Sequence, residues 1–247
     1  MEKLITFEKI SNFAYTSLSI VKKPIKGIVV DFFGLGYNKM IKAPFEENKY
    51  FQRGERFAPQ GILYVFPYNN PWHWMNSQAV AYTDDVLDAI ISGLGLDENI
   101  PIVYTGGSMG GQSCLVYTRY AKRVPVATVA NCPVCDSVFH FTERPDLPRT
   151  FYSSLYHMDC SLDDSLRTVS PLHLVDGMPK SVKYFVYHCK EDRSVNFERH
   201  SIPFCREMEK EHDITLTLVE GRGHCDLGDE MYDEFFGRIS NAILGNG

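Results

Sequence analysis

The stretch Val103-Tyr104-Thr105-Gly106-Gly107-Ser108-Met109-Gly110-Gly111 decides the fold of this chain. The apolar run 101–104 predicts a buried strand, and apolar residues of 114–121 repeat with the spacing of a helix. A chain that turns from strand to helix in so few residues forces Ser108 into a positive-φ conformation. The neighbouring glycines let the backbone crowd together, since a β-carbon there would clash. The turn therefore presents the Ser108 hydroxyl at the end of a sheet.

Gly-x-Ser-x-Gly between a strand and a helix is the pattern of a nucleophile elbow. The alternative is a glycine-rich turn that holds a phosphate group at a helix N-terminus. A phosphate-binding P-loop would carry lysine after its last glycine, where this chain has Gln112. We therefore predict that Ser108 is a nucleophile.

The composition suits one enzyme-sized domain. The chain has 247 residues, 44% of them hydrophobic, which predicts a single domain over 1–247 with a sizeable core. The net charge is −6 and Lys and Arg form only short pairs, so we expect no nucleic-acid partner and no anionic membrane. Apolar runs are too short for a membrane span, and the charged segment 1–8 does not match a signal peptide.

Seven cysteines are spread over the predicted strands and helices: Cys114, Cys132, Cys135, Cys160, Cys189, Cys205 and Cys225. This odd, scattered set indicates reduced thiols and a cytoplasmic protein. Cys132 and Cys135 have the Cys-x-x-Cys spacing of a redox pair or of half a zinc site. No second ligand pair follows at zinc spacing, and the motif closes a predicted strand instead of opening a helix. We interpret both as packing residues and expect neither metal nor cofactor.

Strands and helices alternate along the chain, which predicts an α/β fold with a mostly parallel, doubly wound sheet of about eight strands and helices on both sides. The expected strands are 4–10, 15–21, 27–33, 61–66, 102–104, 126–131, 182–189 and 214–219. The first two are expected to form an antiparallel hairpin or meander, and the later, nearly continuous apolar runs suit buried parallel strands.

Helical periodicity marks three further segments. One begins after Asn76, a predicted N-cap, the second begins near Pro203, and the third covers 232–243. The segment 136–179 breaks this alternation and is long and rich in aromatic residues. We predict that it is a lid insertion over the catalytic edge; the alternative is a helical insertion without substrate contact.

A serine nucleophile needs a base to accept its proton and a carboxylate to orient that base. His224 lies in a glycine-rich loop directly after the predicted strand 214–219, where it can reach a serine at the same edge. We predict that His224 is the base. His73, which follows the strand 61–66, is its rival.

Asp192 follows the predicted strand 182–189 by three residues and is the expected carboxylate. Glu191 and Asp226 are the alternatives. The order serine, aspartate, histidine, each after its own strand, is the order of α/β-hydrolases among the triad orders known.

An acyl-transfer intermediate also needs two N–H donors for its oxyanion. We predict the backbone N–H groups of Met109 and Leu35, the latter in the loop Phe33-Gly34-Leu35-Gly36-Tyr37. Tyr37, Trp72 and Trp74 are candidates for contact with a sugar or aryl group of the substrate. For the two tryptophans the alternative is packing over the nucleophile helix.

Together these residues resemble the α/β-hydrolase superfamily over nearly the whole chain. The C-terminal third is similar to the catalytic domain of the prolyl oligopeptidase group and related small esterases, in Ser170-Pro171-Leu172, in the strand leading to His188 and Asp192, and in the glycine-flanked His224. The resemblance implies the α/β-hydrolase fold and assigns nucleophile, acid and base to Ser108, Asp192 and His224.

The chain departs from that family in several places. Phe33-Gly34 stands where the family has His-Gly, and Cys189 stands where it has glycine. The chain also has no room for the N-terminal propeller and lacks the glutamate-pair motif of the peptidases, which favours a small esterase.

The sequence thus predicts a serine hydrolase that cleaves a small carboxylic ester through an acyl-enzyme. The alternatives are a peptidase of the prolyl oligopeptidase type, an acyltransferase or thioesterase on the same triad, and a non-catalytic binding protein with this fold. The oligomeric state does not follow from the sequence.

Overall fold

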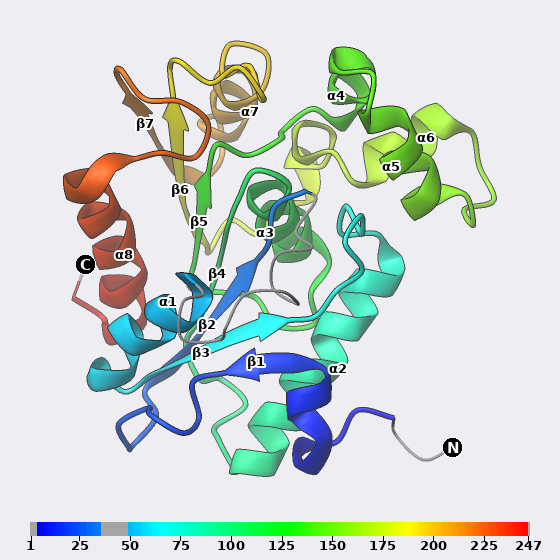
Figure 1. The fold of residues 1–247 in the computed structure, drawn as a ribbon. Coiled ribbons are helices and arrows are strands. Elements are labelled where there is room, and N and C mark those ends of the chain that lie inside the picture. The colour runs from blue at the N-terminus through cyan, green and yellow to red at the C-terminus, as the bar shows by residue number, and fades with distance from the viewer. Residues whose placement is uncertain (1–3, 36–48, 247) are drawn as a thin grey trace.

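A sheet of seven strands runs through the part of the chain that the computed structural model describes, residues 4–35 and 49–246 (Figure 1). The strands are β1 (Ala14–Thr16), β2 (Gly27–Phe32), β3 (Ile62–Pro67), β4 (Ile102–Gly107), β5 (Ala127–Asn131), β6 (Lys183–Cys189) and β7 (Asp213–Val219). Their order across the sheet is β1-β3-β2-β4-β5-β6-β7. β1 is antiparallel to β3, and every other neighbouring pair is parallel.

The central strands are apolar because helices cover both of their sides. Every residue of β2, β3 and β5 is buried. Valine, isoleucine and aromatic residues suit such positions, since branched side chains pack well on a pleated surface and no side faces water. The expected parallel strands are therefore confirmed, with β4 extending to Gly107 and thus reaching Ser108 directly.

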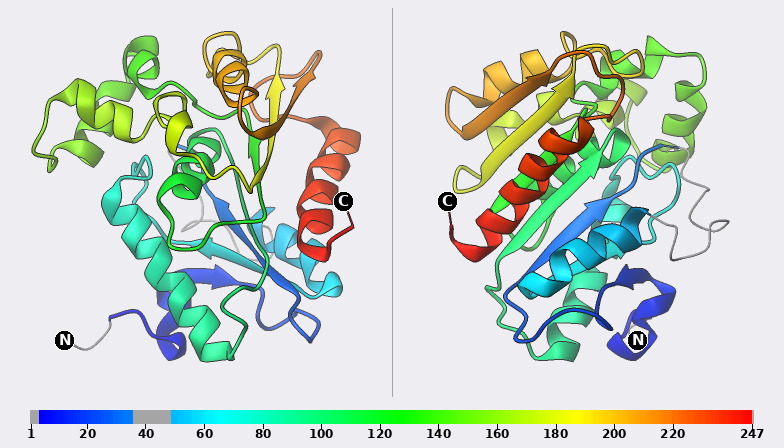
Figure 2. Two further views of the ribbon diagram at one scale, coloured as in Figure 1. Left: turned by 180° about the vertical axis from the view of Figure 1, so that it is seen from behind. Right: turned by 60° about the vertical axis from the view of Figure 1, so that its left-hand side comes forward.

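Helices form a layer on each side of the sheet (Figure 2). One layer holds α1 (Lys49–Phe57) and α8 (Gly228–Leu244), and the other holds α2 (Ser77–Leu94), α3 (Met109–Tyr120) and α7 (Ser201–Met208). The predicted cap of α2 is confirmed, because Asn76 Oδ1 accepts a hydrogen bond from the backbone N–H of Ala79 at 2.9 Å. Single 3-10 turns lie at Ala58–Gln60, Pro171–His173 and Val175–Gly177.

The N-terminal hairpin prediction was wrong. The segment 4–10 contains a 3-10 helix, Phe7–Asn12, and the second expected strand shortens to β1. A β-carbon on Gly93 of α2 would lie 2.3 Å from Phe7, so the ring packs directly on bare helix backbone. β1 pairs with β3 instead of with the segment before it, and the sheet of the described residues has seven strands, one fewer than expected.

Three short helices fill the insertion between β5 and β6. They are α4 (Ser137–Glu143), α5 (Leu147–Leu155) and α6 (Leu162–Thr168). Figure 1 shows them as one group on the side toward which β5 and β6 point. In an α/β sheet this is the side where ligands bind, so a lid over 136–179 stays our prediction.

Candidate active site

The turn between β4 and α3 holds Ser108 in a strained conformation, with φ 60° and ψ −125°. A β-carbon on Gly110 would lie 2.0 Å from the carbonyl oxygen of Phe32, and one on Gly106 would lie 2.4 Å from the carbonyl oxygen of Gly110. Both positions therefore require glycine. The backbone N–H of Ser108 donates to the carbonyl of Asn131 at 2.9 Å, which ties the turn to the end of β5. The positive φ expected from the sequence is thus present, and the Ser108 side chain is half-buried.

His224 and Asp192 meet at the same edge of the sheet. His224 follows β7, Asp192 follows β6, and His224 Nδ1 lies 2.6 Å from Asp192 Oδ2. This distance is that of a strong hydrogen bond in which Nδ1–H donates to a carboxylate. The imidazole is 27% exposed, whereas the Asp192 side chain has no exposed surface. The bond leaves Nε2 as the acceptor nitrogen of the ring, and the Cys225 thiol lies 3.8 Å from it.

The Asp192 carboxylate is oriented from four directions. Oδ1 accepts hydrogen bonds from the backbone N–H groups of Ser194 at 2.8 Å and Val195 at 2.9 Å. Oδ2 faces His224 and lies 3.4 Å from His188 Nε2. Burial on its own would raise the pKa of Asp192, but hydrogen bonds from His188 and His224 outweigh it and hold the pKa well below its usual value. The group therefore stays a carboxylate at neutral pH.

The rival acid and base residues lie elsewhere. Glu191 is exposed, and Asp226 is exposed and forms an ion pair with Arg222. His73 is buried, its Nδ1 accepts from the backbone N–H of Met75 at 3.0 Å, and burial lowers its pKa to about 3. A neutral, enclosed imidazole of this kind is a core residue.

Cys225 connects the His224 loop to the serine turn. Its Sγ lies 3.8 Å from His224 Nε2 and would lie 3.3 Å from a β-carbon on Gly107, the residue before Ser108. The side-chain amide of Asn131, whose carbonyl holds the Ser108 N–H, also donates to the carbonyl of Cys225 at 3.3 Å. The loop after β7 is thus fixed against the turn at Ser108. Ser108 Oγ forms no hydrogen bond with His224 in this structure, although both residues belong to its described part. In serine hydrolases such a bond often forms at full strength only when substrate is bound.

The expected oxyanion donors lie beside the serine turn. A β-carbon on Gly34 would be 3.5 Å from the Ser108 β-carbon, so the loop that carries Leu35 approaches the nucleophile closely. Met109 is the first residue of α3, where backbone N–H groups have no partner inside the helix. The assignment of both N–H groups to an oxyanion hole stays a prediction.

Of the three candidate substrate residues, Trp72 and Trp74 belong to the described part of the chain and differ in exposure. Tyr37 lies outside the described residues. Trp72 is half-buried, with the Arg149 guanidinium 5.6 Å from its ring centre, and it lines a cavity of about 280 Å³ between the loop after β3 and α5. The interpretation of Trp74 as a substrate contact was wrong, because its side chain is fully buried and stacks on Phe151 with 4.0 Å between ring centres.

His188, to which the sequence assigns no role, lies behind Asp192 in the structure. Its side chain is fully buried, Nε2–H donates to the Val195 carbonyl at 3.0 Å, and Nδ1 lies 2.6 Å from Ser201 Oγ. These bonds fix the ring against the carboxylate. The available signal was a histidine inside a buried strand, which needs partners to be tolerated there.

A cluster of His140, Glu143 and His200, residue types that can bind a metal, joins α4 to the start of α7. His140 Nδ1 and His200 Nε2 lie 2.5 Å and 3.0 Å from one oxygen of Glu143. His200 Nδ1 accepts two backbone N–H groups, from Cys135 and Asp136, so Nε2 carries the proton that Glu143 accepts. A metal would need that nitrogen bare, so this cluster is a structural tie for the inserted helices.

Comparisons with protein-family models and with curated proteins found no match. Among solved structures, the chain is similar to a thermophilic esterase from the Planctomycetes species Thermogutta terrifontis with propionate bound, at 19% identity and a TM-score of 0.66, over 99% of this chain and 94% of that one. The same esterase phosphonylated by sarin matches at 18% identity and a TM-score of 0.66, over 99% of this chain and 95% of that one.

A puromycin-hydrolyzing peptidase from Mycobacterium tuberculosis is also similar, at 15% identity and a TM-score of 0.67, over 91% of this chain and 35% of that one. None of the helices in residues 4–35 and 49–246 is long and apolar enough to cross a membrane. The parallel sheet, the strained turn at Ser108 and these structural likenesses together show that the chain has the α/β-hydrolase fold.

Proposed function

We propose that this protein is a serine hydrolase that cleaves a carboxylic ester through an acyl-enzyme intermediate. The observation that carries the proposal is the 2.6 Å hydrogen bond between His224 Nδ1 and Asp192 Oδ2, beside a serine held at φ 60°. An imidazole whose Nδ1 proton is held by a buried carboxylate presents a basic Nε2, which is what a serine nucleophile requires.

The proposed reaction begins with attack of Ser108 Oγ on the ester carbonyl carbon. His224 Nε2 accepts the hydroxyl proton, and Asp192 stabilises the resulting imidazolium. The N–H groups of Met109 and Leu35 receive the oxyanion. Collapse of the intermediate breaks the ester bond, and His224 gives its proton to the departing alcohol. Water then attacks the acyl-enzyme by the same steps and releases the acid.

The geometry around Asp192 explains how the pair would keep its tautomer during turnover. Two backbone N–H groups hold Oδ1, and His188 lies 3.4 Å behind Oδ2, so the carboxylate cannot turn away from His224. His188 is a positioning residue here, because it touches Asp192 and not the reacting atoms. Burial of Asp192 makes its hydrogen bond to the developing imidazolium stronger than it would be in water.

The same three side chains could serve a peptidase, an acyltransferase or a thioesterase, and the similarity to the Thermogutta terrifontis esterase supports hydrolysis of an ester. The similarity to a puromycin-hydrolyzing peptidase supports the alternative of a peptidase. Panels of short esters, thioesters and amides on the purified protein separate these chemistries. A small-molecule ester, with a sugar or aryl group near Trp72, is the substrate class that we propose.

All seven cysteines are free thiols in the structure, which supports our proposal of a reducing, cytoplasmic compartment.

Hydrolysis of short p-nitrophenyl esters by the wild type and by Ser108→Ala tests the proposal. Loss of a triad nucleophile lowers kcat by on the order of 10,000-fold or more. The matched control is Ser92→Ala, since Ser92 is exposed at the end of α2, away from the serine turn. Equal rates for the wild type and Ser108→Ala would refute the mechanism, whereas loss of activity in both variants would point to damage to folding.

A further inference from the structure

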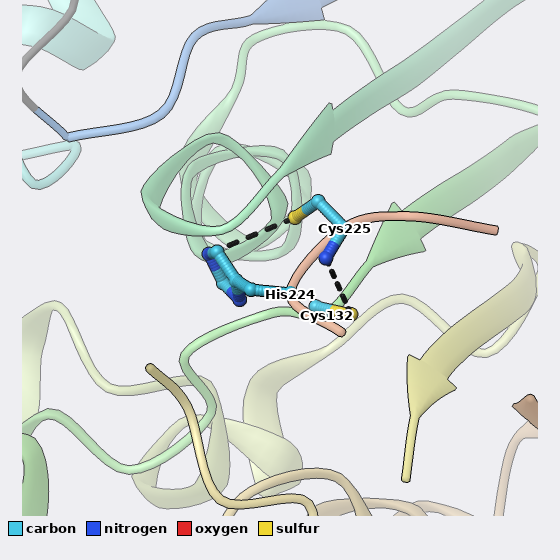
Figure 3. A group of neighbouring side chains, drawn as sticks. All are labelled: Cys132, His224 and Cys225. Atoms are coloured by element: carbon cyan, nitrogen blue, oxygen red, sulfur yellow. Dashed lines mark hydrogen bonds between the residues drawn. The ribbon is translucent and has the colours of Figure 1, made fainter. Parts of the chain in front are cut away.

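Two thiols and one imidazole converge beside the turn between β4 and α3 (Figure 3). Cys132 follows β5 directly, and His224 and Cys225 lie in the loop after β7. The sulfur atoms of Cys132 and Cys225 and a ring nitrogen of His224 all lie within 4.8 Å of one another. The three residues include the proposed catalytic base. Cys132 stands 92 positions before His224 and 93 before Cys225, so only the fold brings the cysteine to the other two residues.

We propose that Cys132, Cys225 and His224 form a zinc-binding site, and that zinc bound there switches the hydrolase off. The inhibitory consequence rests on the proposed function, whereas the metal site does not. Two thiolates and an imidazole are the donor set that zinc prefers over magnesium and calcium, which favour oxygen ligands.

The spacing of the three ligand atoms suits one zinc ion. Zinc lies about 2.3 Å from a thiolate sulfur and about 2.0 Å from an imidazole nitrogen. Two sulfurs on one ion are therefore at most about 4.6 Å apart, and a sulfur and a nitrogen at most about 4.3 Å apart. His224 Nε2 and Cys225 Sγ already lie 3.8 Å from each other. Since the two sulfurs and a ring nitrogen of His224 lie within 4.8 Å of one another, the side chains must rotate to bring all three onto one ion, which would then keep one open position.

The hydrogen bond at the other nitrogen of His224 also fits a metal ligand. Histidines that bind metals almost always donate their second ring N–H to a carboxylate or a carbonyl, which fixes the tautomer and strengthens the ligand. His224 Nδ1 has this partner in Asp192 at 2.6 Å. The arrangement that makes Nε2 a good base for Ser108 therefore also makes it a good ligand for zinc.

The sulfur of Cys132 is buried and faces two backbone N–H groups. It accepts hydrogen bonds from the backbone N–H groups of Cys189 and Cys225, both at 3.4 Å. The hydrogen bond with Cys189 on its own would lower the pKa of Cys132, but the contact with Cys225 and burial outweigh it and raise that pKa, so zinc must displace the thiol proton when it binds. Cys135, the other half of the Cys-x-x-Cys motif, is fully buried in the part of the hydrophobic core that also contains Cys114 and Cys205. Cys132 lies in a different part of the core, together with Cys189. The motif therefore contributes one zinc ligand and not two.

Zinc at this site blocks the proposed reaction directly. An Nε2 lone pair that is bound to zinc cannot accept the Ser108 proton. Binding of metal and general-base catalysis therefore exclude each other at one atom. Removal of the metal by a chelator restores the free imidazole without any change of covalent structure.

Cobalt binding to the reduced protein tests the site independently of activity. Co²⁺ is titrated into the Ser108→Ala variant with a thiol-free reductant, and the thiolate-to-cobalt charge-transfer absorption is recorded. We expect one equivalent to bind and added Zn²⁺ to displace it. Cys132→Ser and Cys225→Ser should each weaken binding by at least about 100-fold, since even an outer partner of a ligand contributes 10- to 100-fold. Circular dichroism checks that each variant is folded.

Cys160→Ser is the matched control, because Cys160 is exposed and lies outside the cluster. It should bind Co²⁺ as the parent does. A missing charge-transfer band, or a band of equal strength in the Cys132→Ser and Cys225→Ser variants, would overturn the metal site.

The second arm measures ester hydrolysis by the wild type during titration with Zn²⁺. We expect inhibition that a chelator reverses, and at least about 100-fold more zinc to be needed in Cys225→Ser. Cobalt binding without any inhibition by zinc would refute the proposed inhibition but not the proposed metal site. If the protein hydrolyses no ester at all, the proposed function fails, and the cobalt titration still decides whether the metal site exists.

Discussion

Replacing Asp192 with asparagine tests the hydrogen bond on which the proposed mechanism depends. The carboxylate is held by two backbone N–H groups on Oδ1, at 2.8 Å and 2.9 Å, and faces His224 with Oδ2. The oxygen of an asparagine side chain would take the two backbone bonds, because an NH₂ group cannot accept them. The NH₂ group then points at His224 Nδ1.

This substitution forces the wrong tautomer on the imidazole. Nδ1 must accept a hydrogen bond from the amide, so the ring proton moves to Nε2, which can no longer take the Ser108 proton. The equivalent change in serine proteases lowers kcat by about 10,000-fold, which corresponds to about 5 kcal/mol of transition-state stabilisation. We expect a loss of that size here. Because the backbone bonds survive, we expect the protein to fold, with a cost to stability of at most about 3 kcal/mol.

The assay compares kcat for a p-nitrophenyl ester in the wild type, Asp192→Asn and Glu191→Gln, with urea unfolding of each. Glu191 is the exposed neighbour of Asp192, so its neutralisation controls for a change of charge in this loop. A kcat for Asp192→Asn within tenfold of the wild-type value, in a folded protein, would refute the role assigned to the carboxylate.

Three further predictions concern the turn, the core and pH. Gly110→Ala places a β-carbon 2.0 Å from the carbonyl oxygen of Phe32 and should lower the free energy of unfolding by about 3 kcal/mol or more, or abolish folding. Gly237→Ala has open space around it and should stabilise α8 by about 0.5–1 kcal/mol. Urea unfolding of both variants checks this pair, and equal stabilities would contradict the account of the elbow. His73 keeps a folded-state pKa of about 3 against an ordinary value of 6.5, so its contribution to stability is complete above pH 6.5 and is lost as the pH falls toward 3, by at most about 1.4 kcal/mol per pH unit. His73→Asn should show a flatter fall in the free energy of unfolding over this range, and an unchanged slope would argue against a buried neutral imidazole. Trp74→Phe should lower stability by about 1–3 kcal/mol and leave KM for aryl esters within twofold, while a large rise in KM would restore Trp74 as a substrate contact.

The serine turn could be predicted from sequence because its requirements are local. Gly106 and Gly110 stand where a β-carbon would meet backbone, and such a clash selects glycine whatever the rest of the chain does. The positions of Asp192 and His224 were also predictable, since both follow parallel strands and the ends of such strands gather at one edge.

The N-terminal segment could not be assigned from its pattern. The segment 4–10 is rich in residues that favour strands, among them Ile5, Thr6 and Phe7, but so short a run does not separate strand from helix. The packing of Phe7 against the bare backbone at Gly93 decides the outcome, and that contact joins residues far apart in the chain.

The side-chain contacts around the site also could not be predicted from the sequence. Trp74 lies in a loop next to other aromatic residues, and only the contact with Phe151 of α5 shows that its ring is enclosed. The approach of Cys225 to Cys132 depends on how the loops after β5 and β7 meet, which no local spacing encodes.

Labelling with a fluorophosphonate, followed by peptide mapping by mass spectrometry, tests the central claim most directly. An activated serine attacks the phosphorus, and the adduct marks the residue whose hydroxyl has a working base beside it. We predict one adduct per chain, on Ser108, in the wild type and its near absence in a folded His224→Ala variant. A folded wild-type protein that stays unlabelled, or one labelled at a different serine, would contradict the proposed nucleophile.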